Sequence, residues 1–160
     1  FSGTSPGQFF TSYESPVTEG LFYITGKDDT WGYLSLWKID PSTPTVIEFV
    51  KLFSSDYTSS GNPIYIDSDD YIYIWTYNGS SGNHEMLKST DSGSTFTAAT
   101  CDSTYQTYIS LYPRSFNIDS NGNKWAADLG SKHIIKSTDG INWTLVYEDS
   151  FGVNWYPYSG

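Results

Sequence analysis

Short apolar and aromatic runs alternate with polar, turn-forming clusters along the chain. The runs are rich in Tyr, Ile, Val and Trp, and the clusters between them are rich in Asp, Ser, Asn and Gly. This arrangement is typical of β-strands joined by tight turns. The predicted strands cover residues 21–25, 33–39, 45–50, 64–66, 71–76, 85–88, 96–99, 116–118, 124–127, 133–136 and 143–147. No segment keeps a helical period between caps, so we expect an all-β fold with almost no helix.

Two short segments of the chain are repeated. Residues 88–91 read Lys-Ser-Thr-Asp, and the same four residues return at 136–139, which is 136 − 88 = 48 positions later. Ile-Asp-Ser occurs at 66–68 and again at 118–120, which is 118 − 66 = 52 positions later. The two spacings differ because the loop after the intervening strand is longer in the first copy, and loops tolerate insertions. A period of this size indicates repeats of one supersecondary unit.

The repeats define three units, at about residues 16–53, 63–100 and 115–148. The second and third units read as strand, Asp-rich turn, strand, loop, strand, repeated turn and strand. This order predicts a four-stranded antiparallel meander in each unit. The first unit has Asp-Pro-Ser-Thr-Pro, residues 40–44, in place of the repeated turn. We expect residues 1–160 to form a single domain of three such sheets.

Charge and composition exclude several classes of partner. The chain has a net charge of −10 and one arginine, Arg114, so it lacks the cations that nucleic acids and anionic membrane surfaces attract. No apolar run is long enough to span a bilayer, so no membrane insertion is expected. The acidity, the low lysine content and the abundance of Tyr, Ser, Thr and Asn favour an extracellular location or the surface of a cell or particle.

The repeated turn combines residue types with distinct structural uses. An Asp side chain accepts hydrogen bonds from nearby backbone amides, a Gly supplies a positive φ, and an aromatic side chain then packs into the next strand. This pattern resembles the Asp-box, or BNR repeat, of sialidases, sortilin-type receptors, xyloglucanases and other β-propellers. The matching residues are Ser89, Asp91, Gly93 and Phe96 and, in a copy one residue shorter, Ser137, Asp139, Gly140 and Trp143.

The resemblance implies a β-propeller and a structural role for the turn residues. In that family the box joins the third and fourth strands of a blade and lies away from the central ligand pocket. Propellers generally have four to eight blades, so three blades make an incomplete ring in one chain. Residues 149–160 look like the connection towards a further blade. A longer chain, further copies of this chain or another protein that pairs with an open sheet edge would complete the ring.

Candidate catalytic residues are few. A sialidase holds its substrate with three arginines, and this chain has one. Other glycosidases need two facing carboxylates. Most acidic residues here lie in turns, where a structural role is expected; they are Asp67, Asp69, Asp70, Asp91, Asp119 and Asp139. The sequence therefore favours a protein without catalytic residues of its own.

Metal sites also have few candidates. Segments 67–70 and 119–123 carry oxygen ligands of the kind that calcium takes, but neither continues into an EF-hand loop. We interpret both as plain turns, with calcium binding as the alternative. His84, His133 and the single Cys101 have no zinc-site spacing. No cofactor is therefore expected.

Aromatic side chains that stack on sugar rings are the remaining candidates for ligand binding. Trp31, Trp155 and Tyr156 lie in loop-like segments and are the predicted ligand-binding residues. Trp75 and Trp125, placed at matching strand positions, are expected to pack between blades. The sequence thus predicts a non-catalytic binding or structural module that binds glycans in adhesion or assembles with itself. The alternatives are a fragment of a propeller glycoside hydrolase and a subunit of a phage, virus or extracellular filament.

Overall fold

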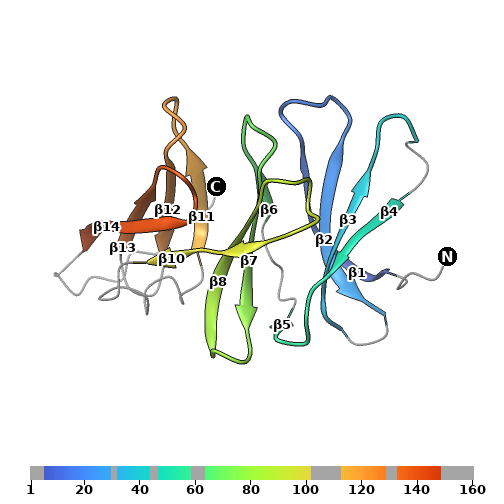
Figure 1. The fold of residues 1–160 in the computed structure, drawn as a ribbon, viewed down its shortest axis with the longest axis horizontal. Helices are drawn as coiled ribbons and strands as arrows, with labels where there is room; N and C mark the ends of the chain where they lie inside the picture. Colours follow the sequence, from blue (N-terminus) through green and yellow to red (C-terminus); the bar gives the residue numbers. More distant parts are fainter. Residues whose placement is uncertain are drawn as a thin grey trace. The chain divides into compact units, whose positions relative to one another are not determined.

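The computed structural model describes residues 6–29, 32–43, 47–58, 64–101, 113–128 and 133–148 of the 160-residue chain. The regular structure in these ranges is all β-strand, and the strands form mostly antiparallel sheets (Figure 1). These ranges contain no helix that is long and apolar enough to cross a membrane. The chain divides into two compact units, Phe1–Ala98 and Ala99–Gly160, so the single domain over residues 1–160 stays a prediction.

The first sheet is a meander of four antiparallel strands in sequence order. They are β1 (Pro6–Glu14), β2 (Phe22–Asp28), β3 (Leu34–Ile39) and β4 (Ile47–Leu52). The predicted strands did not include β1, whose segment mixes Pro, Gly and polar residues with its aromatic ones. Alternate side chains of β3 separate two faces of the sheet. Leu34 and Leu36 point into the core, and Trp37 on the other face contacts the rings of Phe9 and Phe49.

The second sheet is built around β7. Its strands are β5 (Tyr57–Thr58), β6 (Ile64–Ile66), β7 (Ile72–Asn78), β8 (Asn83–Ser89) and β9 (Thr97–Ala98). β6 to β9 form the four-stranded meander, and β5 pairs with the C-terminal end of β7, at Tyr77 and Asn78. Ile72 and Ile74 of β7 are fully buried on one face, while Tyr73 and Trp75 are buried on the other.

The apolar core of the first unit lies between its two sheets. Its buried members are Tyr23, Leu34, Leu36, Phe53, Ile64, Ile66, Ile72, Ile74 and Leu87. The first strands of the two meanders, β1 and β6, also lie side by side, and the ring centroids of Tyr13 and Tyr65 are 6.1 Å apart. Burial of these side chains is the main favourable term that holds the two sheets together.

The second unit contains the third sheet. β11 (Pro113–Ile118), β12 (Lys124–Asp128), β13 (His133–Ser137) and β14 (Asn142–Glu148) repeat the antiparallel meander, and β10 (Thr100–Cys101) runs parallel to β14. Ala126, Ile135 and Trp143 are buried in this unit, and the Phe116 ring lies 6.3 Å from the Trp143 ring. The predicted all-β array of three four-stranded antiparallel sheets is thereby confirmed.

Candidate functional site

The first copy of the repeated turn joins β8 to β9. Asp91 folds its carboxylate back into the turn, where Oδ1 accepts the Thr95 backbone N–H at 2.8 Å and Oδ2 accepts the Thr95 hydroxyl at 2.6 Å. The Ser89 hydroxyl donates to Asp91 Oδ1 at 2.7 Å and accepts the Gly93 N–H at 2.9 Å. The Ser and Asp side chains therefore satisfy the backbone groups of the turn that no strand can pair.

Gly93 and Phe96 fasten this turn to the first sheet. Gly93 is buried with a φ of 90°, and a Cβ atom at this position would lie 2.6 Å from Cδ2 of Leu36. Glycine alone avoids both the left-handed strain and this overlap. The Phe96 ring packs with its centroid 5.0 Å from that of Phe53. Local hydrogen bonds thus set the shape of the turn, and these two residues fix its position.

The second copy joins β13 to β14 with one residue fewer. Asp139 Oδ1 accepts the backbone N–H groups of Ile141 and Asn142, each at 2.8 Å, and Oδ2 accepts the Asn142 amide at 2.7 Å. The Ser137 hydroxyl again accepts a glycine N–H, that of Gly140, at 2.8 Å. Gly140 has a φ of 76°, and the following Trp143 is 1% exposed. The shorter copy therefore makes the same kinds of bond as the first.

These hydrogen bonds keep both carboxylates charged. Bonds from the side chain and backbone of Thr95 lower the pKa of Asp91 to about 2. Burial acts to raise the pKa of Asp139, but bonds from Asn142 outweigh it and hold that pKa far below its ordinary value. A carboxyl group with so low a pKa carries no proton to donate near neutral pH.

Asp67 organises a different turn, between β6 and β7. Its Oδ1 accepts the backbone N–H groups of Asp69 and Tyr71, each at 3.0 Å, and its Oδ2 accepts the Tyr73 hydroxyl at 2.7 Å. Asp67 and Tyr73 are both buried. Burial, and then the hydrogen bond to Asp67, raises the pKa of Tyr73. The Tyr73 hydroxyl therefore stays protonated and holds the carboxylate in place.

Asp119 organises the equivalent turn of the third sheet, between β11 and β12. Its Oδ1 accepts the backbone N–H groups of Asn121 and Asn123, each at 2.9 Å, and its Oδ2 accepts the indole N–H of Trp125 at 3.0 Å. Bonds from the side chains of Asn123 and Trp125 hold the pKa of Asp119 far below its ordinary value. The carboxylate is therefore bonded within its own turn, as in the second sheet.

The repeated lysine and the register of the strands correct one sequence prediction. Trp125 faces the turn aspartate as Tyr73 does, and Lys88 and Lys136 lie over these two rings, 5.7 Å and 4.9 Å from the centroids. Trp125 thus corresponds to Tyr73, and the predicted match of Trp125 with Trp75 is wrong. The buried indole N–H of Trp75 has no hydrogen-bond partner in the described part of the chain. In the second and third sheets, a lysine and an aspartate therefore hold one aromatic ring between them.

The first sheet fills the same turn positions with other residues. Ser15 follows β1, and its hydroxyl oxygen accepts the backbone N–H groups of Val17 at 3.1 Å and Thr18 at 2.9 Å. Asp40 follows β3 and accepts the Ser42 backbone N–H at 2.8 Å. The Ser42 side-chain and backbone bonds lower the pKa of Asp40. Each sheet thus closes both turns with a side-chain acceptor, although only two sheets share the repeated sequence.

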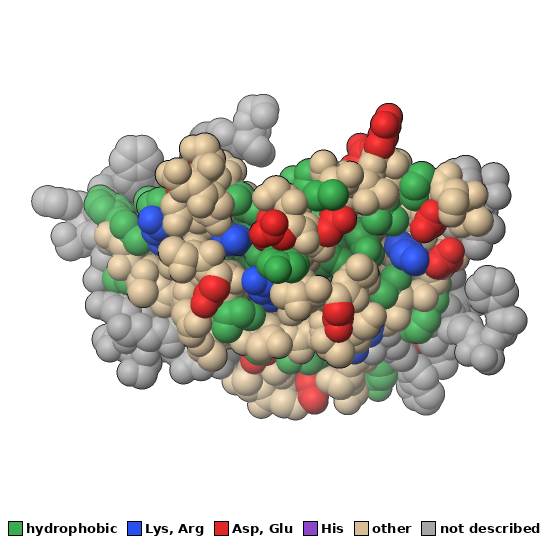
Figure 2. All heavy atoms as spheres, turned by 45° about the horizontal axis from the view of Figure 1, so that its top comes forward, with side chains coloured by type: hydrophobic (Ala, Val, Ile, Leu, Met, Phe, Trp, Pro, Cys, Tyr) green, Lys and Arg blue, Asp and Glu red, His purple; other side chains and the backbone are tan. Residues whose placement is uncertain are grey.

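Acidic side chains are dispersed over the surface. On the face drawn in Figure 2, Asp and Glu side chains lie singly or in small groups among hydrophobic and neutral ones. In the described ranges, no three His, Cys, Asp or Glu side chains lie close enough together to hold a metal ion. Asp67 and Asp119 accept bonds from donors of their own turns, and Asp70 accepts the Ser15 hydroxyl. Calcium binding at these turns stays a prediction.

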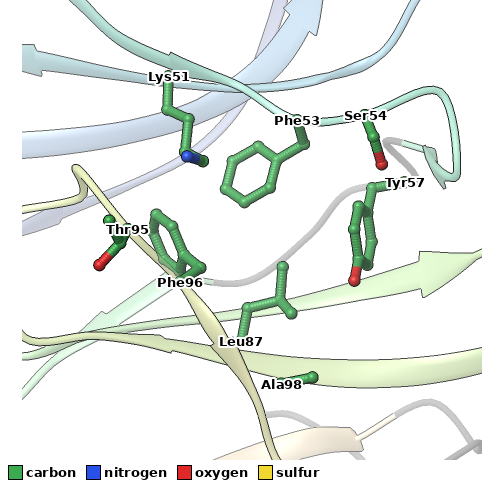
Figure 3. Close-up of a pocket in the computed structure, with 8 residues that line it drawn as sticks. All are labelled: Lys51, Phe53, Ser54, Tyr57, Leu87, Thr95, Phe96 and Ala98. Carbon is green, nitrogen blue, oxygen red and sulfur yellow. The ribbon is translucent and has the colours of Figure 1, made fainter.

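A cavity of about 340 Å³ opens in the first unit, between the end of β4 and the strands β8 and β9 (Figure 3). Its lining residues are Lys51, Phe53, Ser54, Tyr57, Leu87, Thr95, Phe96 and Ala98. The Phe53 ring is central, with the Phe96 ring at 5.0 Å and the Tyr57 ring at 6.1 Å. Phe53 is itself 5% exposed, so the accessible aromatic surface of the cavity comes from the half-buried rings of Tyr57 and Phe96.

Polar groups lie at both ends of this cavity. Lys51 donates from Nζ to the Ser94 carbonyl at 3.0 Å, beside Thr95. At the other end, the Tyr57 hydroxyl donates to Glu85 Oε2 at 3.2 Å. Burial, and then the charge of Glu85, raises the pKa of Tyr57. The phenol is therefore neutral, with its proton directed to the carboxylate and its oxygen able to accept a further bond.

The predicted ligand-binding residues Trp31, Trp155 and Tyr156 lie outside the described residues. The cavity could not be predicted from the sequence, because its walls come from segments far apart in the chain. Phe53 and Phe96 are 96 − 53 = 43 positions apart. The one lining residue that the sequence analysis singled out was Phe96, the aromatic residue of the first repeated turn.

No protein-family model and no curated protein matches the chain. Among solved structures, it is similar to a candidate glycosidase from Bacteroides thetaiotaomicron VPI-5482, with a TM-score of 0.53 and 12% identity over 92% of this chain and 52% of that one. It is also similar to 1,3Gal43A, an exo-β-1,3-galactanase from Clostridium thermocellum, with a TM-score of 0.50 and 12% identity over 88% of this chain and 39% of that one.

These similarities concern the fold. The two solved structures are glycosidase-like propeller folds, and the three sheets of this chain are blades of that kind. The chain spans about half the length of the first protein and about two fifths of the second.

Proposed function

We propose that this chain belongs to a glycan-binding β-propeller and has no catalytic residues of its own. Its repeated turns act as Asp-boxes, in which Ser89, Asp91, Ser137 and Asp139 hold the blades together. Two lines of support are the Ser–Asp–Gly hydrogen bonding found in both copies and the similarity of the fold to glycosidase propellers.

The observation that carries the proposal is where the turn carboxylates point. A glycosidase needs one carboxyl group that stays protonated and a second that faces it across the substrate. The turn carboxylates instead accept hydrogen bonds from donors in or beside their own turns, as seen at Asp40, Asp67, Asp91, Asp119 and Asp139. Aromatic rings and hydroxyl groups at a cavity remain, and pockets that bind small molecules are lined by aromatic side chains with a few polar groups.

A glycan array followed by a hydrolysis assay tests the proposal. The protein should bind a subset of glycans, and long incubation with those glycans should release no new reducing ends. Release of sugar from a bound glycan would favour the alternative, a segment of a glycoside hydrolase. Absence of any binding would overturn the glycan-binding function.

The exposed apolar side chains on the outer face of the first sheet are evidence for a further blade that packs there. Phe9, Ile47 and Phe49 are 40%, 38% and 36% exposed around the buried Trp37, on the face opposite the core. We propose that a copy of this chain or the rest of a longer chain covers this face, outside the cell or on a particle surface. Light scattering that shows a strict monomer at high concentration would exclude self-association.

A further inference from the structure

We propose that the cavity between β4 and β8–β9 binds a single pyranose ring that carries a carboxylate, such as the uronic acid residue of a glycan. This inference rests on the proposed glycan-binding function and names the site and the class of sugar. It assigns binding to the groove between two neighbouring sheets of the first unit. The supporting features are the size of the cavity, its aromatic wall and the placement of its polar groups.

The size of the cavity suits one sugar residue. Its volume of about 340 Å³ lies near the lower end of the range for ligand sites, roughly 300–1,000 Å³. Phe96 and Tyr57 are half-buried and offer the accessible ring surface to the apolar C–H face of a pyranose (Figure 3). Phe53 and Leu87 are buried and support these rings from the core. An extended oligosaccharide would need a longer groove than this lining provides.

The polar groups at the two ends would orient that ring. Lys51 is the one charged side chain among the lining residues, in a chain with 8 basic and 18 acidic residues. Its ammonium group has three donors, and one of them is bonded to the Ser94 carbonyl, so two remain for a carboxylate. At the opposite end, the Tyr57 hydroxyl donates to Glu85 and the Ser54 hydroxyl donates to Asp56, so their oxygens serve as acceptors for the hydroxyl groups of the sugar.

The third sheet shows why this site occurs at one of the two repeated turns. Phe96 is half-buried and leaves part of its ring open to the cavity, whereas Trp143 at the corresponding place is 1% exposed and fills its surroundings. The first repeated turn therefore has a second use. It positions the half-buried Phe96 ring beside the cavity, where the buried Phe53 ring supports it.

The test compares two sugars that differ in the carboxylate. Titration calorimetry of the full chain with methyl β-glucuronide and with methyl β-glucoside should show tighter binding of the glucuronide, by about tenfold or more, as expected for one charge-assisted contact. Lys51→Gln should abolish this preference. Lys38→Gln, which removes a lysine paired with Glu48 away from the cavity, should preserve it. Equal binding of both sugars, or an unchanged preference in Lys51→Gln, would overturn the proposal.

A blocking variant separates this inference from the proposed function. Ala98→Phe fills the cavity from an exposed position on β9 and removes no existing contact partner of the core. It should abolish glucuronide binding while the circular dichroism melting curve stays that of the wild type. If Ala98→Phe and Lys51→Gln keep every glycan-array signal, the cavity proposal fails and the glycan-binding function stands. If the wild type binds no glycan, both fail.

Discussion

The second and third sheets form two equivalent turns, the Asp67 or Asp119 turn and the repeated turn, with different residues. At the fourth position of the Asp67 and Asp119 turns, the second sheet has Asp70 with a φ of 59° and the third has Gly122 with a φ of 77°. The ring that donates to the turn aspartate is Tyr73 in one sheet and Trp125 in the other. The repeated turn has two residues with positive φ, Ser92 and Gly93, in the second sheet, and one, Gly140, in the third.

The difference shows what each position requires. Each turn needs a residue that tolerates a left-handed backbone and a side-chain acceptor that reaches the turn amides. The turns after β6 and β11 also need a donor at the tip of an aromatic ring. Several residue types supply each of these features. Two turn glycines also differ in their surroundings: a Cβ atom on Gly93, in the repeated turn of the second sheet, would contact the first sheet, whereas the space around Gly122, in the Asp119 turn of the third sheet, is open. Alanine substitutions at these two glycines should therefore have unequal effects.

The largest difference is expected between Gly93→Ala and Gly122→Ala. Both place a Cβ on a left-handed backbone, which costs about 1–2 kcal/mol. Only Gly93→Ala also drives that Cβ against the fully buried Leu36, which raises the total to about 2–5 kcal/mol. Urea unfolding followed by tryptophan fluorescence measures both. Equal losses of stability would show that the Gly93 turn does not press on the first sheet.

Tyr73→Phe should have the next largest effect. It leaves the buried Asp67 carboxylate without its 2.7 Å hydroxyl donor, and a hydrogen bond to a charged group is worth about 1.5–3 kcal/mol. Trp125→Phe removes the matching donor from the more exposed Asp119 and should cost less. Tyr71→Phe is the control, because it keeps the ring under Lys88. A loss in Tyr71→Phe as large as that in Tyr73→Phe would contradict the assignment.

Ser92→Gly should stabilise the protein. Ser92 is exposed with a φ of 57°, so glycine relieves left-handed strain, with a net gain of about 0.5–1 kcal/mol after its larger unfolded-state entropy. Ser94→Gly in the same turn lies outside the positive-φ residues and should instead destabilise by a similar amount. The urea midpoints of the two variants should move in opposite directions. Movement in the same direction would refute the strain argument.

Acid should weaken the repeated turns by a smaller amount. The pKa of Asp91 is about 2 in the folded chain against an ordinary value of 3.8, so its contribution to stability is complete above the ordinary value and disappears as the pH falls from about 4 to about 2. Asp91→Asn should flatten the decline of the urea midpoint in that window. Asp29→Asn, at an exposed position in the turn after β2, serves as the matched control. An unchanged slope in Asp91→Asn would contradict the lowered pKa.

The sequence predicted the second and third sheets because their turns are local. A short stretch of sequence contains each turn aspartate together with its hydrogen-bond partners. The partners lie within six residues of Asp67, Asp91, Asp119 and Asp139. β1 was missed because its segment mixes Pro, Gly and polar residues with its aromatic ones and shows no regular apolar run. The cavity was missed for a different reason, since it exists only where two sheets meet.

The match of tryptophans failed because it relied on residue type. The position that matters is six residues after the turn aspartate, where Tyr73 and Trp125 lie, and not the presence of an indole. Lys88 and Lys136 were visible as part of the repeated segment, but their place over these rings follows from strand pairing, which joins Tyr73 to Lys88 and Trp125 to Lys136.

The most direct test of the whole account measures stability and glycan binding on one variant, Asp139→Asn. The account assigns Asp139 to the turn of the third sheet and binding to the cavity of the first unit. It therefore predicts a lower urea midpoint with the dissociation constant of the best array glycan unchanged. A wild-type midpoint together with lost binding would show that this turn belongs to the binding site and would contradict the account.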